Sequence, residues 1–288
     1  MFHTAPFKTI KAKGKLIDLG RPVVMGILNT TPDSFYRSSR HQTAQSIADM
    51  SVKMVNDGAA ILDIGGYSSR PGAGHISAEE EIRRLDPALT AIKDVLPHIP
   101  VSVNTFRSSV ARQVVENFGV DIINDISGGM ADGDMFSTVA RLRVGYVLMH
   151  MVGTPQTMQQ NPYYQDVVKE VTLFLSQQLD KLAWAGVTDV IIDPGFGFAK
   201  TVEHNYQLMA RLDELKLFDQ PLLVGISRKS MIYNILGNDP GQALNGTTVL
   251  NTVALQKGAD ILRVHDVKEA AECINLVETL QKSSNGVS

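Results

Sequence analysis

The stretch VSVNTFRSSVARQVVENFGVDIINDISGG, residues 101–129, carries the pattern that decides the fold. A short apolar run opens it, a segment with helical character follows, and a second apolar run occupies 121–126. Gly119 stands between the helical segment and the second run, where a glycine in the left-handed conformation ends a helix. A strand, a helix and a strand in this order form one parallel β-α-β unit.

The same unit recurs on both sides of this stretch. Each apolar run is continuous rather than alternating, which is typical of strands covered on both faces in a parallel sheet. Eight β-then-α units in a row favour a closed barrel over an open sheet, so the predicted fold is α/β, a single (β/α)8 TIM barrel. The predicted strands are 23–28, 60–64, 101–103, 121–126, 145–149, 190–192, 222–226 and 261–264.

The segments between the strands have the helical period, with one apolar face each. Ser77 and Ser108, with Asp33 and Ser34, are predicted caps, and Ser77 is followed three residues later by Glu80. Glycines just past the helices are predicted C-terminal caps, at Gly58, Gly119, Gly186 and Gly258. The predicted buried faces include Ile47, Met50, Met54 and Val55; Ile82, Leu85, Leu89 and Ile92; and Val171, Leu175, Leu179 and Leu182.

Length and composition predict one domain, 1–288, with an N-terminal β-hairpin within 1–20 and a frayed tail at 283–288. Cys273 is the single cysteine, so no internal disulfide can form and a cytoplasmic location is expected. The first twenty residues resemble no secretory leader, and no apolar run has the length of a membrane span. A net charge of −3 indicates neither nucleic acid nor a membrane as a partner.

Polar or glycine clusters follow nearly every predicted strand. In a barrel these ends meet at the C-terminal face, where barrel enzymes have their active sites. Helix caps and turns use the same residue types, so one cluster alone would decide little, but eight on one face indicate a site. His150 has two interpretations, a packed histidine or a ligand contact. No P-loop, dinucleotide fingerprint or zinc-ligand spacing occurs.

Two kinds of side chain make up these clusters. Amides and a carboxylate can bind the edge of a flat heterocycle, since a carboxylate accepts two adjacent donors side by side. Cationic groups suit phosphate oxygens or a carboxylate. The backbone N–H of Ser230, after the seventh strand, could add attraction for an anion. The first set is Asn29, Asn104, Asn124 and Asp193, and the second is Arg70, Lys229, Arg263 and His265.

Eight segments, from about residue 23 to 266, resemble those of dihydropteroate synthase. They are MGILNTTPDSF (25–35), ILDIGGYSSRPGA (61–73), VSVNTF (101–106), IINDISGG (122–129), LMHMVGTPQTM (148–158), IIDPGFGFAK (191–200), VGISRKS (224–230) and ILRVHDV (261–267). The resemblance implies a transferase of the alkyl/aryl (non-methyl) class in folate biosynthesis. It would condense 6-hydroxymethyl-7,8-dihydropterin diphosphate with p-aminobenzoate to give 7,8-dihydropteroate and diphosphate. Mg²⁺ as cofactor, a homodimer and a sulfonamide target are also implied.

The resemblance also implies a role for individual residues. Asn29 would be a ligand of Mg²⁺. The catalytic residues would be Asn104, Lys229 and Arg263. The pterin would be bound by Asn104, Asn124, Asp193 and Lys229, the diphosphate by Arg70, Arg263 and His265, and p-aminobenzoate by Phe35, Ser69, Pro71, Phe198 and Ser230.

The chain departs from the family at Asn104, where Asp is usual, and at Tyr67, where Glu is frequent. If the missing charge acts as a typical preorganised group, its loss costs about 3–4 kcal/mol in the transition state. An alternative is therefore a catalytically impaired or non-catalytic pterin-binding homologue. A pterin-dependent methyltransferase barrel is a further alternative, but it has no use for a diphosphate site at Arg263 and His265.

Overall fold

A computed structural model describes residues 8–12, 14–30, 44–68, 74–154, 156–158, 160 and 162–284. The chain opens with a hairpin in which β1 (Thr9–Ala12) and β2 (Lys15–Asp18) pair antiparallel. This confirms the hairpin predicted within 1–20.

Eight parallel strands follow and close into a barrel, which confirms the predicted fold. They lie in the order β8-β7-β6-β5-β4-β3-β10-β9. A parallel bridge between Ile192 and Leu222 joins the two ends of this order. The strands are β3 (Val23–Asn29), β4 (Ala59–Gly65), β5 (Val101–Asn104), β6 (Ile122–Asp125), β7 (Gly145–Met149), β8 (Val190–Asp193), β9 (Leu223–Val224) and β10 (Ile261–Val264). Only β9 departs by more than a residue at one end from its predicted run.

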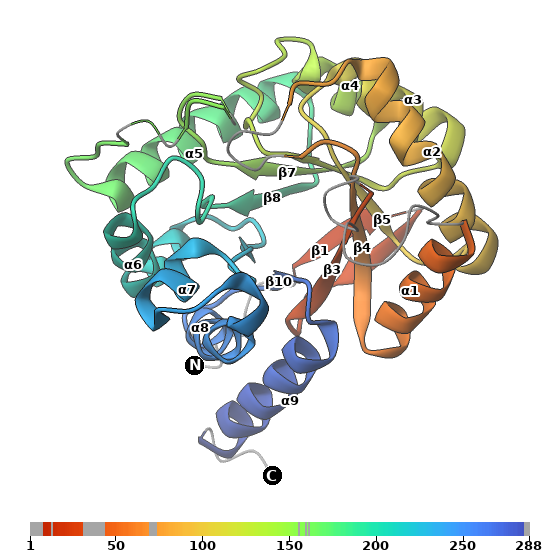
Figure 1. Ribbon diagram of the computed structural model, residues 1–288. Helices are drawn as coiled ribbons and strands as arrows, with labels where there is room; N and C mark the ends of the chain where they lie inside the picture. Colours follow the sequence, from red (N-terminus) through yellow and green to blue (C-terminus); the bar gives the residue numbers. More distant parts are fainter. Residues whose placement is uncertain are drawn as a thin grey trace, which may run out of the picture.

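Helices surround the strands (Figure 1). They are α1 (Ala44–Asn56), α2 (Ala78–Val95), α3 (Ser108–Phe118), α4 (Met135–Leu142), α5 (Val167–Ala185), α6 (Val202–Ala210), α7 (Ser230–Leu236), α8 (Leu244–Gln256) and α9 (Val267–Ser284), with 3-10 turns η2 (Leu212–Leu217) and η3 (Pro240–Gln242). Residues 283 and 284, predicted as part of a frayed tail, thus belong to α9, and 285–288 lie outside the described residues.

The local signals of the helices are largely confirmed. The Ser77 side chain accepts the backbone N–H of Glu80 at the start of α2. The four predicted C-cap glycines all have positive φ. Ser108 was predicted wrongly, because α3 starts after Arg107 as N-cap and Ser108 is its first residue. The predicted caps Asp33 and Ser34 lie outside the described residues.

One predicted buried residue of α1 is exposed. Met50 is 38 % exposed. The side of α1 that faces the barrel carries Ser51 instead, which is fully buried and donates its hydroxyl to the backbone carbonyl of Ile47. A serine can occupy an apolar face because its hydroxyl is satisfied within its own helix.

The barrel interior is apolar at one end and polar at the other. Ile10 and Leu19 of the hairpin pack against inward-facing residues near the strand starts: Met25, Ile61, Ile122, Val147, Ile191, Leu223 and Ile261. Lys8 pairs with Asp260 at 2.8 Å, and the backbone N–H of Lys11 bonds Asp189, so the hairpin is tied to this end. Ligands can therefore reach the barrel axis from the C-terminal end of the strands.

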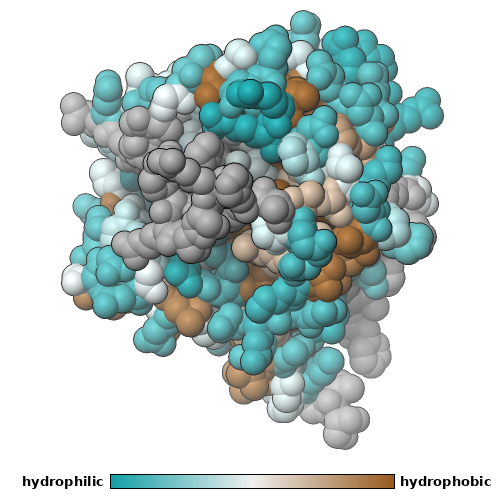
Figure 2. All heavy atoms as spheres, turned by 45° about the vertical axis from the view of Figure 1, so that its right-hand side comes forward, coloured by the Kyte–Doolittle hydropathy of each residue, from teal (hydrophilic) through white to brown (hydrophobic). Residues whose placement is uncertain are grey.

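The surface is mainly hydrophilic on the side drawn in Figure 2, with hydrophobic residues in separate patches. Within the described residues, no helix combines the length and the hydropathy needed to cross a membrane.

Candidate active site

Three of the predicted amides lie in one register at or near the C-terminal ends of β3, β5 and β6, with Gly65 of β4 between the first two. Asn29 pairs with Gly65, Gly65 with Asn104, and Asn104 with Asn124. A Cβ added to Gly65 would lie 3.5 Å from the side-chain oxygen of Asn29 and 3.8 Å from Cβ of Asn104. The missing side chain at Gly65 leaves room between these two amides at the barrel mouth.

Asp63, which the sequence interpretation missed, lies beneath these amides. It is fully buried, two residues before Gly65 on the same inward face of β4. Ser102 donates to its Oδ1 at 2.6 Å. The Asn124 amide nitrogen lies 3.3 and 3.2 Å from its two oxygens, and Arg263 donates to Oδ2 from Nε at 2.7 Å. The second contact of Arg263, from Nη2, measures 2.6 Å.

These contacts decide what the neighbouring side chains offer a ligand. An ionised carboxylate only accepts, so the –NH2 of Asn124 must face Asp63 and its carbonyl oxygen faces elsewhere. The Nε and Nη2 edge of Arg263 is taken by Asp63, which leaves Nη1 as a donor for another oxygen. Asp63 thus couples an amide of the ring-binding set to a cation of the anion-binding set. The signal in the sequence was an acid within the apolar run at 60–64.

Asp193 and Lys229 form the other side of the mouth. Asp193 ends β8, is 7 % exposed, and accepts the backbone N–H of Gly195 at 2.7 Å. Burial raises the pKa of Asp193, while the nearby cations, Lys229 first and then Arg263, oppose that rise. Burial lowers the pKa of Lys229 to about 8, against the attraction of Asp193.

The position of Lys229 is set by the loop after β8. Its Nζ donates to the backbone carbonyl of Phe196 at 2.5 Å and stands 4.6 Å from the ring centroid of Phe198. A Cβ added to Gly225 would lie 3.8 Å from Cβ of Arg263 and 3.9 Å from Nζ of Lys229. The side chains of Arg263 and Lys229 therefore border the space left by the missing side chain of Gly225.

His265 and Ser230 are exposed. Ser227 Oγ lies 3.0 Å from Nδ1 of His265 and also accepts the backbone N–H of His265. Ser227 can therefore donate its own hydrogen to Nδ1, which places the proton of the neutral ring on Nε2. Desolvation of the ring among its neighbours, and then the charge of Arg263, lowers the pKa of His265 to about 4.

His150 proves to be a packed residue. It is 2 % exposed, with the rings of Tyr164 and Phe174 at 6.0 and 5.0 Å. Burial, followed by the charge of Lys200, lowers the pKa of His150. Its Nδ1 lies 3.0 Å from Nζ of Lys200, a buried lysine to which the sequence interpretation assigned no role.

Tyr67 also packs into the protein. It is 7 % exposed, meets the Phe106 ring edge-on at 5.1 Å, and its hydroxyl accepts the Gln156 amide at 2.6 Å. Four predicted site residues lie outside the described residues, namely Phe35, Ser69, Arg70 and Pro71.

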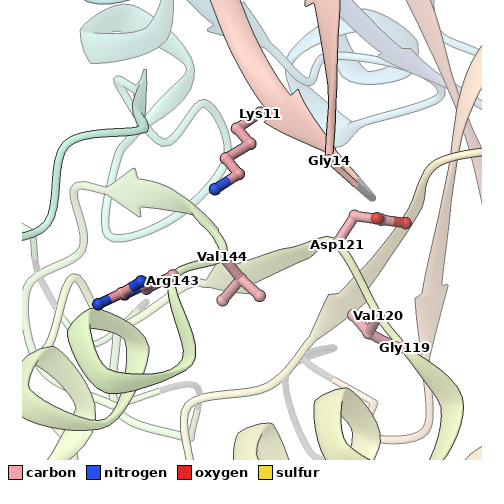
Figure 3. Close-up of a pocket in the computed structure, with 7 residues that line it drawn as sticks. All are labelled: Lys11, Gly14, Gly119, Val120, Asp121, Arg143 and Val144. Carbon is pink, nitrogen blue, oxygen red and sulfur yellow. The ribbon is translucent and has the colours of Figure 1, made fainter.

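A separate pocket of about 240 Å³ lies at the other end of the barrel (Figure 3). It is bounded by the hairpin and by the segments that lead into β6 and β7. Its lining residues are Lys11, Gly14, Gly119, Val120, Asp121, Arg143 and Val144. None of them belongs to the mouth. Across the described residues, no group of three or more His, Cys, Asp or Glu side chains could hold a metal ion.

The fold is that of a TIM-barrel enzyme, and its mouth carries amides and a carboxylate beside cationic side chains. The profile of the family described as pterin binding enzyme matches residues 25–265. The chain therefore belongs to the family of pterin-binding enzymes.

Individual relatives narrow the identification. The dihydropteroate synthase of Escherichia coli strain K12 is 42 % identical over 277 residues, covering 95 % of this chain and 97 % of the relative. That of Synechocystis is 43 % identical, covering 92 % of each chain. The Yersinia pestis enzyme, solved with a sulfonamide drug complex, has a TM-score of 0.89 at 39 % identity, covering 95 % of this chain and 99 % of that one. Within the family the chain is a dihydropteroate synthase, a transferase.

The Xanthomonas albilineans dihydropteroate synthase, solved with 4-aminobenzoic acid, has a TM-score of 0.88 at 37 % identity. The alignment covers 96 % of this chain and 98 % of that chain.

Proposed function

We propose that the mouth joins 6-hydroxymethyl-7,8-dihydropterin diphosphate to p-aminobenzoate by holding the pterin in the barrel and the diphosphate at its rim. The observation that carries the proposal is the Asp63 network, in which one buried carboxylate binds both Asn124 and Arg263. It brings Asn124, which is proposed to bind the ring, next to Arg263, which is proposed to bind the anion. The relatives solved with 4-aminobenzoic acid and with a pterine-sulfa conjugate support the pairing of ligands.

The pterin would lie between the two sides of the mouth. Asp193 would accept the 2-amino group and the adjacent ring N–H, as a carboxylate accepts paired donors. Asn124 would offer its carbonyl oxygen, and Lys229 would donate to a ring acceptor. Asn104 would add a neutral amide at the opposite edge.

The diphosphate would be held by Arg263 and His265. Nη1 of Arg263 and Nε2 of His265 are the donors that remain after their contacts with Asp63 and Ser227. Arg70, outside the described residues, is proposed as a third donor. A departing diphosphate gains negative charge on its bridging oxygen, so fixed cations at this point favour the transition state.

Asn29 fits a role as one ligand of Mg²⁺. Its amide oxygen is the kind of ligand that a hard cation prefers, and it lies at the barrel mouth beside the space left by the missing side chain of Gly65. The described residues contain no carboxylate cluster that could bind the ion without the substrate. Mg²⁺ is commonly held by substrate phosphates and few protein groups. The ion would neutralise diphosphate charge.

The reaction needs positioning more than covalent chemistry. The bond from the CH2 carbon to the diphosphate oxygen breaks as positive charge develops on that carbon, the amine nitrogen forms the new bond to it, and the amine proton leaves to water. Holding the amine in line with the departing oxygen lowers the entropic part of the barrier. Phe198 and Ser230, with Phe35, Ser69 and Pro71 outside the described residues, are proposed to border p-aminobenzoate and the sulfonamides that share its site.

The test is diphosphate release from the pterin diphosphate with Mg²⁺, with and without p-aminobenzoate, for this chain and for Asn104→Asp. We expect release that depends on both substrates, and a faster rate in the variant. The gain is at most about 10²- to 10³-fold if the charge at position 104 acts as a typical preorganised group. No release by this chain at high enzyme concentration, with pterin binding intact, would favour the non-catalytic alternative.

We further propose a homodimer in the cytoplasm. Exposed apolar side chains on successive helices would suit a partner surface, and they include Ile235, Leu236, Val249, Leu276 and Leu280. Light scattering of the purified chain measures the assembly state, and a monomer at micromolar concentration would contradict the dimer.

A further inference from the structure

A buried lysine, Lys200, lies behind the proposed pterin site. It follows the loop after β8, is 3 % exposed, and immediately precedes Thr201, the N-cap of α6. Its Nζ donates to the carbonyls of Gly195 and Phe198 at 3.0 and 3.1 Å and lies 3.0 Å from Nδ1 of His150. Among the described side chains, no carboxylate lies within ion-pair distance of it. A cation placed so deeply without a direct counter-ion is costly, which points to a function.

The loop is held by its carbonyl groups. Lys200 binds those of Gly195 and Phe198 from behind, and Lys229 binds that of Phe196 from the mouth. The Tyr164 hydroxyl donates to the carbonyl of Ala199 at 2.8 Å. Two lysines therefore bind carbonyl groups of one loop, and the shape of the loop sets where Lys229 stands.

Close contacts restrict this loop further. Gly195 has φ of +73°, and a Cβ there would lie 2.0 Å from the carbonyl oxygen of His150. A Cβ at Gly197 would lie 2.9 Å from Cδ of Lys229. The backbone thus passes close to His150, just after β7, at Gly195 and close to Lys229 at Gly197, where a side chain would not fit.

We propose that Lys200 is a positioning residue of the pterin site, which holds the 195–199 loop against Lys229 and supplies positive charge behind Asp193. It touches neither substrate. The proposal rests on the assignment of Asp193 and Lys229 to the pterin.

The electrostatics of the group agree with this role. Three cations act on Asp193, namely Lys229, Arg263 and Lys200, and each favours its ionised form. Burial lowers the pKa of Lys200 to about 7, while Asp193 raises it and Lys229 lowers it. His150 faces the same amine, and its own pKa is lowered by burial and by Lys200. Loss of the Lys200 charge should therefore make Asp193 easier to protonate.

The experiment measures kcat and KM for the pterin diphosphate between pH 5 and 9, at saturating p-aminobenzoate and Mg²⁺. The variants are Lys200→Met, which removes charge and donors, and Lys200→Gln, which removes the charge but keeps a donor. Tyr164→Phe is the matched control, because it removes an uncharged donor to the same loop.

For Lys200→Met we expect KM to rise by roughly tenfold, since Lys229 loses its fixed place. The pH at which kcat/KM falls on the acid side should rise by about half a unit in both Lys200 variants, because Asp193 loses a cation. It should stay at the wild-type value in Tyr164→Phe. Substrate ionisations are common to all four proteins and cancel in the comparison.

The proposal would be overturned if the pH at which kcat/KM falls on the acid side were unchanged in both Lys200 variants. It would also be overturned if this pH rose by the same amount in Tyr164→Phe. Lys200→Gln keeps the test decisive if Lys200→Met does not fold. Failure of the proposed function is a separate result, because the wild-type chain would then release no diphosphate, or Asp193→Asn would leave KM for the pterin diphosphate unchanged.

Discussion

Asp63 shows how one buried side chain can organise a site that it does not itself present to the ligand. Its carboxylate is surrounded by donors from three other strands, Ser102 of β5, Asn124 of β6 and Arg263 of β10. Removing one partner of a buried ion pair leaves an uncompensated charge, which typically costs about 3–5 kcal/mol.

We predict that Asp63→Asn lowers kcat/KM by about 10²-fold or more, because Arg263 and Asn124 lose the group that orients them. Steady-state kinetics with the pterin diphosphate measures the loss. The effect should shrink in an Arg263→Met background, since Asp63 acts through Arg263. Asp260→Asn is the control, because it breaks an ion pair with Lys8 at the far end of the barrel. Equal losses in both single variants would argue for general destabilisation instead.

At the scale of elements, the two ends of the barrel have different roles. The N-terminal hairpin closes the apolar end, and the loops after the strands build the mouth. Changes at the closed end should therefore act on stability alone.

Ile10→Ala tests this division. Ile10 is 1 % exposed and packs on the barrel floor, so its truncation should lower the free energy of unfolding by about 2–4 kcal/mol. The kcat/KM of the folded variant should equal that of the wild type. Urea unfolding and kinetics at the same temperature supply both numbers. Leu16→Ala, in the same hairpin at 67 % exposure, should change stability by no more than about 0.5 kcal/mol. A fall in kcat/KM for Ile10→Ala would show that the two ends are coupled.

At the scale of the whole molecule, Lys200 and Lys229 make stability depend on pH. In the unfolded chain a lysine keeps its proton up to about pH 10.4. Burial lowers the pKa of Lys200 to about 7 and that of Lys229 to about 8 in the folded protein. Between pH 7 and 9 the unfolded state therefore binds more protons, and by linkage the folded state gains stability as pH rises.

The free energy of unfolding should accordingly increase from pH 7 to pH 9, with a limiting slope of about 1.4 kcal/mol per pH unit for each fully displaced proton. Urea denaturation at several pH values checks this. Lys200→Met should reduce the slope, whereas Lys169→Met, at an exposed lysine of α5, should not. A flat profile in the wild type would mean that both lysines stay protonated in the folded state.

The amino-acid sequence by itself determined the barrel and the face that carries the site. Continuous apolar runs are typical of strands covered on both sides, and glycines stand between several helical segments and the next run, so eight units could be counted without coordinates. The strand ends then named Asn124, Asp193, Lys229 and Arg263, because polar groups after a buried strand can only lie at its rim.

Tertiary structure alone decided how these groups are held. The roles of Asp63 and Lys200 arise from contacts with residues far along the chain. Arg263 is 200 positions from Asp63, and His150 is 50 positions from Lys200. Likewise, whether Ser108 caps a helix or Met50 faces the core depends on the exact rotation of a helix against its sheet. Local patterns specify strands and helices, whereas hydrogen bonds to buried charges depend on which strands the closed barrel brings together.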